Sequence, residues 1–191
     1  MLTIGASSAS QLVSGNPAPP FSAEATNGKQ ATQEIFKDKY YAFILEGQST
    51  ANKNIHVRYR IESIIAMLSQ EKRESFIFFT VADVSSLSSL VHWIVRSKVK
   101  SNEQENKVTI YMDFKGEILK NFQLSQQTSN FVLVDNHGII RFIKSGTVTE
   151  EELQQICSYL SVQFQAPYIL APIDISAAIH NSRYVWKPYL P

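Results

Sequence analysis

Apolar runs and amphipathic stretches alternate along the middle of the chain. Residues 40–45 (YYAFIL) and 76–81 (FIFFTV) are compact apolar runs, which are typical of strands covered on both faces of a sheet. The segment between them, residues 54–70, carries apolar residues at helical spacing: Ile61, Ile64, Ile65 and Leu68. The pattern predicts an amphipathic helix whose nearby charged residues face solvent: Arg58, Arg60, Glu62 and Lys72.

A second helix is predicted after the second apolar run. Asp83 or Ser85 can cap it. The apolar residues that follow share one helical face: Leu87, Leu90, Val91, Ile94 and Val95. Residues 98–107 (KVKSNEQENK) are charged and polar, so they predict a solvated loop. Together these segments predict a βαβ unit.

Turn residues mark three more pairs of strands. Asn27-Gly28 predicts a tight hairpin, because these residues supply the positive φ values that such a turn requires. Residues 113–116 (DFKG) and 135–138 (DNHG) predict two further strand-turn-strand units. The second of these is the firmer hairpin.

The last predicted helix carries the single cysteine. Thr149 followed by Glu152 is a capping box, which marks a helix start. The apolar residues of this helix lie on one face: Leu153, Ile156, Cys157 and Leu160. We therefore expect the Cys157 thiol to point into the core and to be inert.

Strands first separated by helices and then joined as a hairpin predict a three-layer α/β/α fold. We expect one domain over residues 15–165, after a flexible polar leader at residues 1–14. The extension at residues 166–191 is rich in proline and carries four large aromatic side chains: Tyr168, Tyr184, Trp186 and Tyr189. It is too apolar for an ordinary disordered tail. It could strap an apolar patch of the domain or dock on a partner protein, and the sequence leaves both open.

Composition excludes several classes of function. The net charge is +1 and basic residues are scattered among acidic ones, so no nucleic-acid surface is expected. No window approaches 18 consecutive apolar residues, so no transmembrane segment is expected. One cysteine excludes an intrachain disulfide, and the four histidines have no metal-binding spacing, so we expect neither a metal nor a cofactor.

Four blocks, in this order, resemble the thioredoxin-like redoxin superfamily, which includes thiol peroxidases and thiol reductases. They are residues 15–21 (GNPAPPF), 40–47 (YYAFILEG), 110–118 (IYMDFKGEI) and 131–142 (FVLVDNHGIIRF). Three other segments resemble in particular its YtfJ-type branch, a bacterial periplasmic family of undefined activity: residues 47–54 (GQSTANKN), 94–102 (IVRSKVKSN) and 139–156 (IIRFIKSGTVTEEELQQI). The resemblance covers residues 15–163 and implies a thioredoxin-like fold and a periplasmic location.

The chain departs from active redoxins at two places. The loop after the first long strand, where the family has its nucleophilic cysteine, reads EGQSTA over residues 46–51. Thr128 stands where the family has a cis-proline before the hairpin strand. Because a thiolate is the nucleophile in redoxin chemistry, thiol exchange cannot start in this loop.

The vestigial loop and the segment beside it are the candidate binding site: Glu46, Gly47, Gln48, Ser49, Thr50, Thr128 and Ser129. Ser49 and Thr50 are expected to cap the following helix, with anion binding as the alternative. Glu46 is either a plain loop carboxylate or a general base with a raised pKa.

We expect a non-catalytic binding or scaffolding protein of the bacterial cell envelope, with a protein partner. The alternative is an enzyme. It would be either a diverged thiol oxidoreductase or peroxidase that uses Cys157, or a hydrolase built around Glu46 and Ser49.

Overall fold

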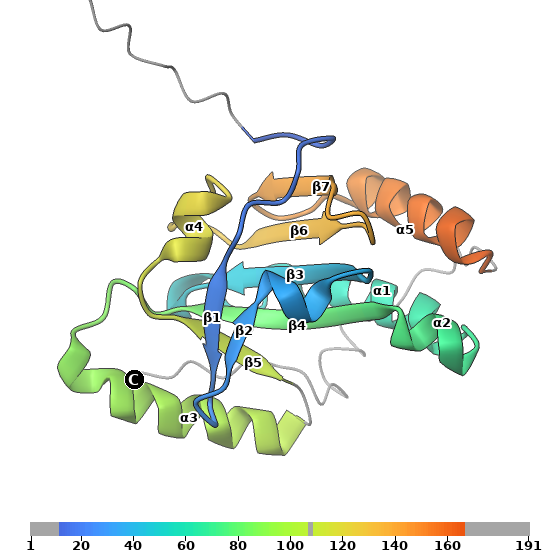
Figure 1. The fold of residues 1–191 in the computed structure, drawn as a ribbon. Helices are drawn as coiled ribbons and strands as arrows, with labels where there is room; N and C mark the ends of the chain where they lie inside the picture. The colour runs from blue at the N-terminus through green and yellow to red at the C-terminus, as the bar shows by residue number, and fades with distance from the viewer. Residues whose placement is uncertain (1–11, 107–108, 167–191) are drawn as a thin grey trace, which may run out of the picture.

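The computed structural model describes residues 12–106 and 109–166. In this part of the chain one sheet has the strand order β2-β1-β5-β4-β3-β6-β7 (Figure 1). Its strands are β1 (Ser22–Ala25), β2 (Gln30–Thr32), β3 (Tyr40–Glu46), β4 (Phe76–Asp83), β5 (Ile110–Asp113), β6 (Asn130–Val134) and β7 (Ile140–Ser145). Strands β3, β4 and β5 are parallel to one another. Strand β6 pairs antiparallel with β3, and β7 pairs antiparallel with β6. The two apolar runs are therefore neighbouring inner strands.

Helices cover both faces of this sheet. They are α1 (Ile55–Ala66), α2 (Gln70–Glu74), α3 (His92–Asn106), α4 (Glu117–Asn121) and α5 (Glu150–Phe164). Phe78 and Ala82 lie four residues apart in β4 and so share a face. Helices α1 and α5 pack on the cluster that includes Phe78, and α3 packs on the cluster of Ala82. Helix α4 and the aromatic cluster of Phe43 and Phe79 cover the opposite face, which completes the expected three layers.

The ends of the chain fall largely outside the described residues. These include residues 1–11 of the expected leader and residues 167–191 of the expected extension. The opening residues that are described pair with the edge of β7: Gly15 N donates to Ile140 O at 2.8 Å and Ile140 N donates to Asn16 O at 2.9 Å. Among the helices of the described part, none has the length and apolar character needed to cross a bilayer.

Two of the three expected strand-turn-strand units are confirmed. Asn27-Gly28 joins β1 to β2, and residues 135–138 join β6 to β7. The third prediction is wrong, because β5 is followed by α4 and not by a strand. Asp113 is the physical reason: its carboxylate accepts hydrogen bonds from Glu117 N at 3.0 Å and Ile118 N at 2.8 Å. These bonds satisfy free amides in the first turn of α4 and favour a helix there.

The helix expected over residues 54–70 is α1, and the short α2 follows it separately. The expectation that Arg58 and Arg60 face solvent is wrong, because both are buried. Arg58 Nη2 donates to Thr80 Oγ1 at 2.7 Å, and its guanidinium lies 4.8 Å from the centroid of the Phe78 ring. A guanidinium can be buried when it finds such partners, and periodicity does not reveal them.

The solvated loop expected over residues 98–107 is also wrong, because α3 extends to Asn106. Val95 and Val99 are buried against β4 and β5. The helix starts later than expected, at His92, after a 3-10 turn at Ser89–Val91. Leu90 therefore leaves the predicted buried stripe and is 80% exposed, and Trp93 is 69% exposed.

The capping box before α5 is confirmed. Thr149 Oγ1 accepts from Glu152 N at 3.3 Å, and Glu152 Oε2 accepts from Thr149 N at 2.8 Å. The apolar face that follows is buried against α1 and the sheet: Leu153, Ile156, Cys157 and Leu160. The expected inward position of Cys157 is therefore confirmed.

Candidate functional site

The candidate site lies where β3 ends and β6 begins. Leu45 pairs with Asn130 in the antiparallel register of β3 and β6, which brings Glu46 beside Ser129. Both residues are buried. The sheet edge thus joins two segments that are far apart in the sequence and that were both expected at the site.

The Glu46 carboxylate is held by three hydrogen bonds. Ser129 Oγ donates to Glu46 Oε1 at 2.6 Å. Asn52 N donates to Oε2 at 2.8 Å, and Asn54 N donates to Oε1 at 3.4 Å. Two of these donors belong to the backbone that follows the loop, so Glu46 fixes the path of the chain between β3 and α1.

Asn54 extends this network to the last loop of the domain. Its Nδ2 donates to Ser129 Oγ at 2.7 Å and to Gly146 O at 3.1 Å. Its Oδ1 accepts from Val148 N at 2.8 Å. The Asn54 amide therefore ties the start of α1 to the segment between β7 and α5.

The loop at Gly47–Thr50 is closed by its own hydrogen bonds. Thr50 Oγ1 accepts from Gly47 N at 2.9 Å and donates to Gly47 O at 3.2 Å. Thr50 is buried, Gln48 is half-buried and Ser49 is exposed. The expectation that Ser49 or Thr50 caps α1 is wrong, because Thr50 closes a 3-10 turn and Asn54 stands at the helix start.

Thr128 takes part through its backbone. Its carbonyl oxygen accepts from Asn130 Nδ2 at 3.0 Å, and its side chain is half-buried. In the described residues no peptide bond is cis, including the one at Thr128. This site therefore uses ordinary trans backbone where the resembled redoxins have a cis-proline.

Burial raises the pKa of the Glu46 carboxyl above its ordinary value. The hydrogen bonds from Ser129, Asn52 and Asn54 oppose this shift, and so does the positive charge of Arg58. Arg58 also forms an ion pair with Glu62, with Nε and Oε1 3.6 Å apart. A carboxylate with a raised pKa can act as a general base, and a nearby hydroxyl can act as a nucleophile.

The positions of the two groups argue against that use. Ser129 is 0% exposed, so a substrate has no access to its hydroxyl in this structure. Ser49, the other candidate nucleophile, is exposed, but the hydrogen bonds of Glu46 go to Ser129, Asn52 and Asn54. The structure does not bring Glu46 and Ser49 together as a catalytic pair.

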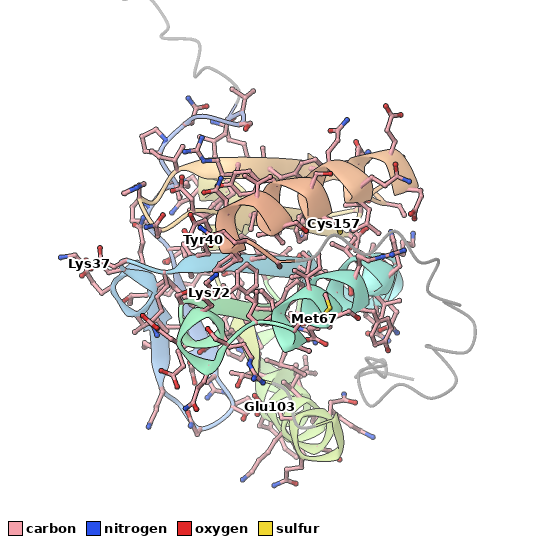
Figure 2. The ribbon with its side chains drawn as sticks, turned by 90° about the vertical axis from the view of Figure 1, so that its right-hand side faces the viewer. Lys37, Tyr40, Met67, Lys72, Glu103 and Cys157 are labelled. Atoms are coloured by element: carbon pink, nitrogen blue, oxygen red, sulfur yellow. The ribbon has the colours of Figure 1, made fainter. Side chains whose placement is uncertain are left out.

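Cys157 is 3% exposed and packs in the apolar cluster that α5 forms with α1 and the sheet. Figure 2 labels it on α5. Burial raises the pKa of its thiol to about 11. The fraction of thiolate at neutral pH is therefore very small, and the thiolate is the reactive form. Cys157 belongs to the core and is separate from the vestigial loop.

Sequence reasoning missed Asn54 and Arg58 as members of this site. Asn54 was used only as the start of the predicted helix and as part of a resembling block, and Arg58 was assigned to the solvent face of that helix. One signal was present in the sequence: three of the four residues 51–54 (ANKN) are polar, directly before an apolar helix. Polar residues at a helix start often take local backbone hydrogen bonds, whereas the Asn54 side chain bonds backbone groups more than ninety positions away, at Gly146 and Val148.

A family model described as "Bacterial protein of unknown function (YtfJ_HI0045)" matches residues 64–163, more than half of the chain. Among curated proteins, no sequence matches.

Solved structures share the fold at low sequence identity. The thioredoxin domain of a thiol-disulfide oxidoreductase from Bacteroides vulgatus is 14% identical, with a TM-score of 0.54 over 78% of this chain and 98% of that one. A thiol peroxidase from Chromobacterium violaceum is 9% identical, with a TM-score of 0.55 over 78% and 87%. A mitochondrial 2-Cys peroxiredoxin from Plasmodium falciparum is 15% identical, with a TM-score of 0.52 over 80% and 96%. The chain has a thioredoxin-like fold.

Proposed function

We propose that this chain, which belongs to the bacterial YtfJ_HI0045 family, is a non-catalytic binding protein of the bacterial cell envelope that uses the thioredoxin-like frame without its thiol chemistry. One observation carries the proposal. At the position of the redoxin nucleophile, the buried network of Glu46, Ser129 and Asn54 holds a closed loop. The loop lies where redoxins have their nucleophilic cysteine, and its residues 46–51 include no cysteine.

A rigid loop suits recognition, because little conformational freedom is lost when a partner binds it. The loop backbone is held from both sides: Thr50 closes it on Gly47, and Glu46 holds the amides of Asn52 and Asn54. Ser49 is the exposed side chain at its centre. A protein partner that contacts this edge of the sheet would meet a preformed surface.

The enzyme alternative has less support. Its thiol form needs Cys157, which is buried and mostly protonated at neutral pH. Its hydrolase form needs Glu46 beside Ser49, and Glu46 is engaged elsewhere. The cell-envelope location rests on the resemblance to the periplasmic YtfJ-type branch.

The test is capture of partners from a bacterial envelope extract by the immobilised full chain. Three forms are compared: the natural chain, Ser49→Arg in the loop, and Val162→Arg as a matched control on the exposed face of α5. We expect a protein retained by the natural chain and by Val162→Arg to be lost with Ser49→Arg. Equal retention by all three forms, or no specific retention, would overturn a binding role for the loop. Recovery of the native protein from the cytosolic fraction would overturn the location.

A further inference from the structure

Helix α3 begins with an exposed apolar surface, which we call the α3 patch. It consists of Leu90 and Trp93, which are 80% and 69% exposed, with the half-buried Val91 and Ile94 beside them. Four other exposed large apolar residues are found in the described part, on separate elements: Val13, Ile35, Met67 and Val162. The α3 patch is distinguished because its two exposed side chains are only three residues apart, with Leu90 in the 3-10 turn that leads directly into α3 and Trp93 in the first turn of the helix.

The domain itself does not need this surface. The inner face of α3 packs through Val95 and Val99 on β4 and β5. Arg96 pairs with Glu24 of β1, and its guanidinium lies over the Phe114 ring, which also holds α3 to the sheet. Leu90 and Trp93 are not members of the cluster beneath α3 and stay exposed. Exposed side chains of this size, grouped together, mark a surface that is covered by something else.

The same chain contains a segment of matching chemistry outside the described residues. Residues 167–191 (PYILAPIDISAAIHNSRYVWKPYLP) carry three tyrosines, a tryptophan and many aliphatic side chains, with only one acidic residue, Asp174. Four prolines restrict the backbone freedom that the segment would lose on docking. Three of its four aromatic residues lie near its end: Tyr184, Trp186 and Tyr189.

The segment is long enough to reach the α3 patch. It begins after α5, whose Phe164 ring contacts Tyr40 at the start of β3, with centroids 4.9 Å apart. The patch follows the other end of β4, on the same helical layer of the sheet and past α1 (Figure 1). Two helix spacings of about 10 Å and a strand length of about 26 Å separate the two points. The residues from Ala166 to Trp186 span about 65 Å when extended.

We propose that residues 184–190 dock on the α3 patch of the same chain, so that the C-terminal extension straps the helical face from α5 to α3. Covalent linkage favours this occupant over a free one, because the segment is held at a high effective concentration near the patch. Trp93 and the aromatic residues of the segment supply the contact area.

The chain offers a direct optical test, because its two tryptophans are Trp93 and Trp186. In full-length Trp186→Phe, Trp93 is the only tryptophan and reports on the patch. An anchor variant adds Tyr184→Asp, Val185→Asp and Tyr189→Asp to this background. A matched control adds the same charges at small residues instead: Ala177→Asp, Ala178→Asp and Ser182→Asp. Acrylamide quenching and the emission maximum of Trp93 are measured for all three, and circular dichroism verifies the fold.

We expect Trp93 to be quenched several-fold less efficiently in the reporter and the control than in the anchor variant, with emission at shorter wavelength. Equal quenching in all three proteins would overturn the proposal. If the anchor variant does not fold, the reporter alone decides: quenching close to that of a free tryptophan amide would show an uncovered patch. Protection that is lost on dilution would assign the patch to a second copy. Protection that requires vesicles of phosphatidylethanolamine and phosphatidylglycerol would assign it to a membrane. Either result overturns the strap.

Discussion

The buried carboxyl group of Glu46 stabilises the fold because it accepts hydrogen bonds from two separate segments of the chain. Burial disfavours the charged form of this carboxyl group. Three hydrogen bonds, together with the positive charge of nearby Arg58, partly restore it. Because its folded pKa is above the ordinary value of 4.5, Glu46 favours folding most at acidic pH, and this contribution is lost as pH rises through the folded pKa. The Ser129 hydroxyl limits that loss, because it bonds the charged form at 2.6 Å.

We predict that Ser129→Ala raises the pKa of Glu46 further and lowers the free energy of unfolding by about 1 to 3 kcal/mol at neutral pH. The difference from the natural chain should shrink on acidification, as Glu46 becomes protonated in both proteins. Carboxyl NMR titration and urea unfolding at several pH values measure the two effects. Ser49→Ala, at the exposed serine of the same loop, is the control and should change neither. A Glu46 pKa that does not move in Ser129→Ala would contradict this account of the network.

The buried thiol gives a second pH dependence, with its window at alkaline pH. The Cys157 pKa is raised from 9.0 to about 11 in the folded protein. The unfolded chain therefore loses this proton first, and the contribution of Cys157 to stability falls as pH rises from 9.0 toward 11. We predict that Cys157→Ala unfolds with a weaker pH dependence across this window, measured by urea unfolding. Identical profiles for the two proteins would show an unperturbed thiol.

Among the elements, the side-chain hydrogen bonds of Asn54 connect segments of the chain that strand pairing does not connect. Asn54 stands at the start of α1 and bonds the segment between β7 and α5 through Gly146 and Val148. This contact crosses more than ninety positions of sequence. The packing of α1 beside α5 therefore depends on one amide as well as on the apolar cluster between them.

We predict that Asn54→Ala costs about 1 to 3 kcal/mol, because it leaves the buried Val148 amide and Gly146 carbonyl without this partner. Hydrogen exchange at Val148 N should accelerate in the variant. Lys53→Ala, at the exposed neighbouring position, should leave both measurements unchanged. Unaltered exchange at Val148 N in Asn54→Ala would mean that the amide does not hold the loop in solution.

Some elements of the fold can be predicted from the periodicity of the sequence, and others cannot. Strands β3 and β4, the hairpin at residues 135–138 and the capping box of α5 follow directly from local pattern, because each depends on neighbours in sequence. The C-terminal half of α3 did not, since Val99 is the single apolar residue in the sequence from 98 to 106 and the rest of that segment resembles a loop. Residues 113–116 are of types that favour a turn, but the same residues can also begin a helix. They begin α4 because the Asp113 carboxylate accepts hydrogen bonds from its first amides.

At the scale of the whole molecule, sequence located the candidate site but not its connections. Glu46, Thr50 and Ser129 were expected there, and the pairing of β3 with β6 brings Glu46 beside Ser129. The bond from Asn54 to Val148 and the burial of Arg58 beside Thr80 depend on tertiary placement, which one sequence does not encode in any local pattern. The α3 patch likewise became visible only when the helix start was fixed at His92.

Turnover is the decisive measurement of whether this thioredoxin-like frame works without thiol chemistry. The natural chain and Cys157→Ser are each supplied with a model disulfide plus reductant, and separately with a peroxide plus reductant. Because the loop at residues 46–51 has no cysteine and Cys157 is buried with a raised pKa, we predict equal rates for both proteins, at the level of the uncatalysed reaction. Turnover by the natural chain clearly above that of Cys157→Ser would contradict it and establish a thiol enzyme.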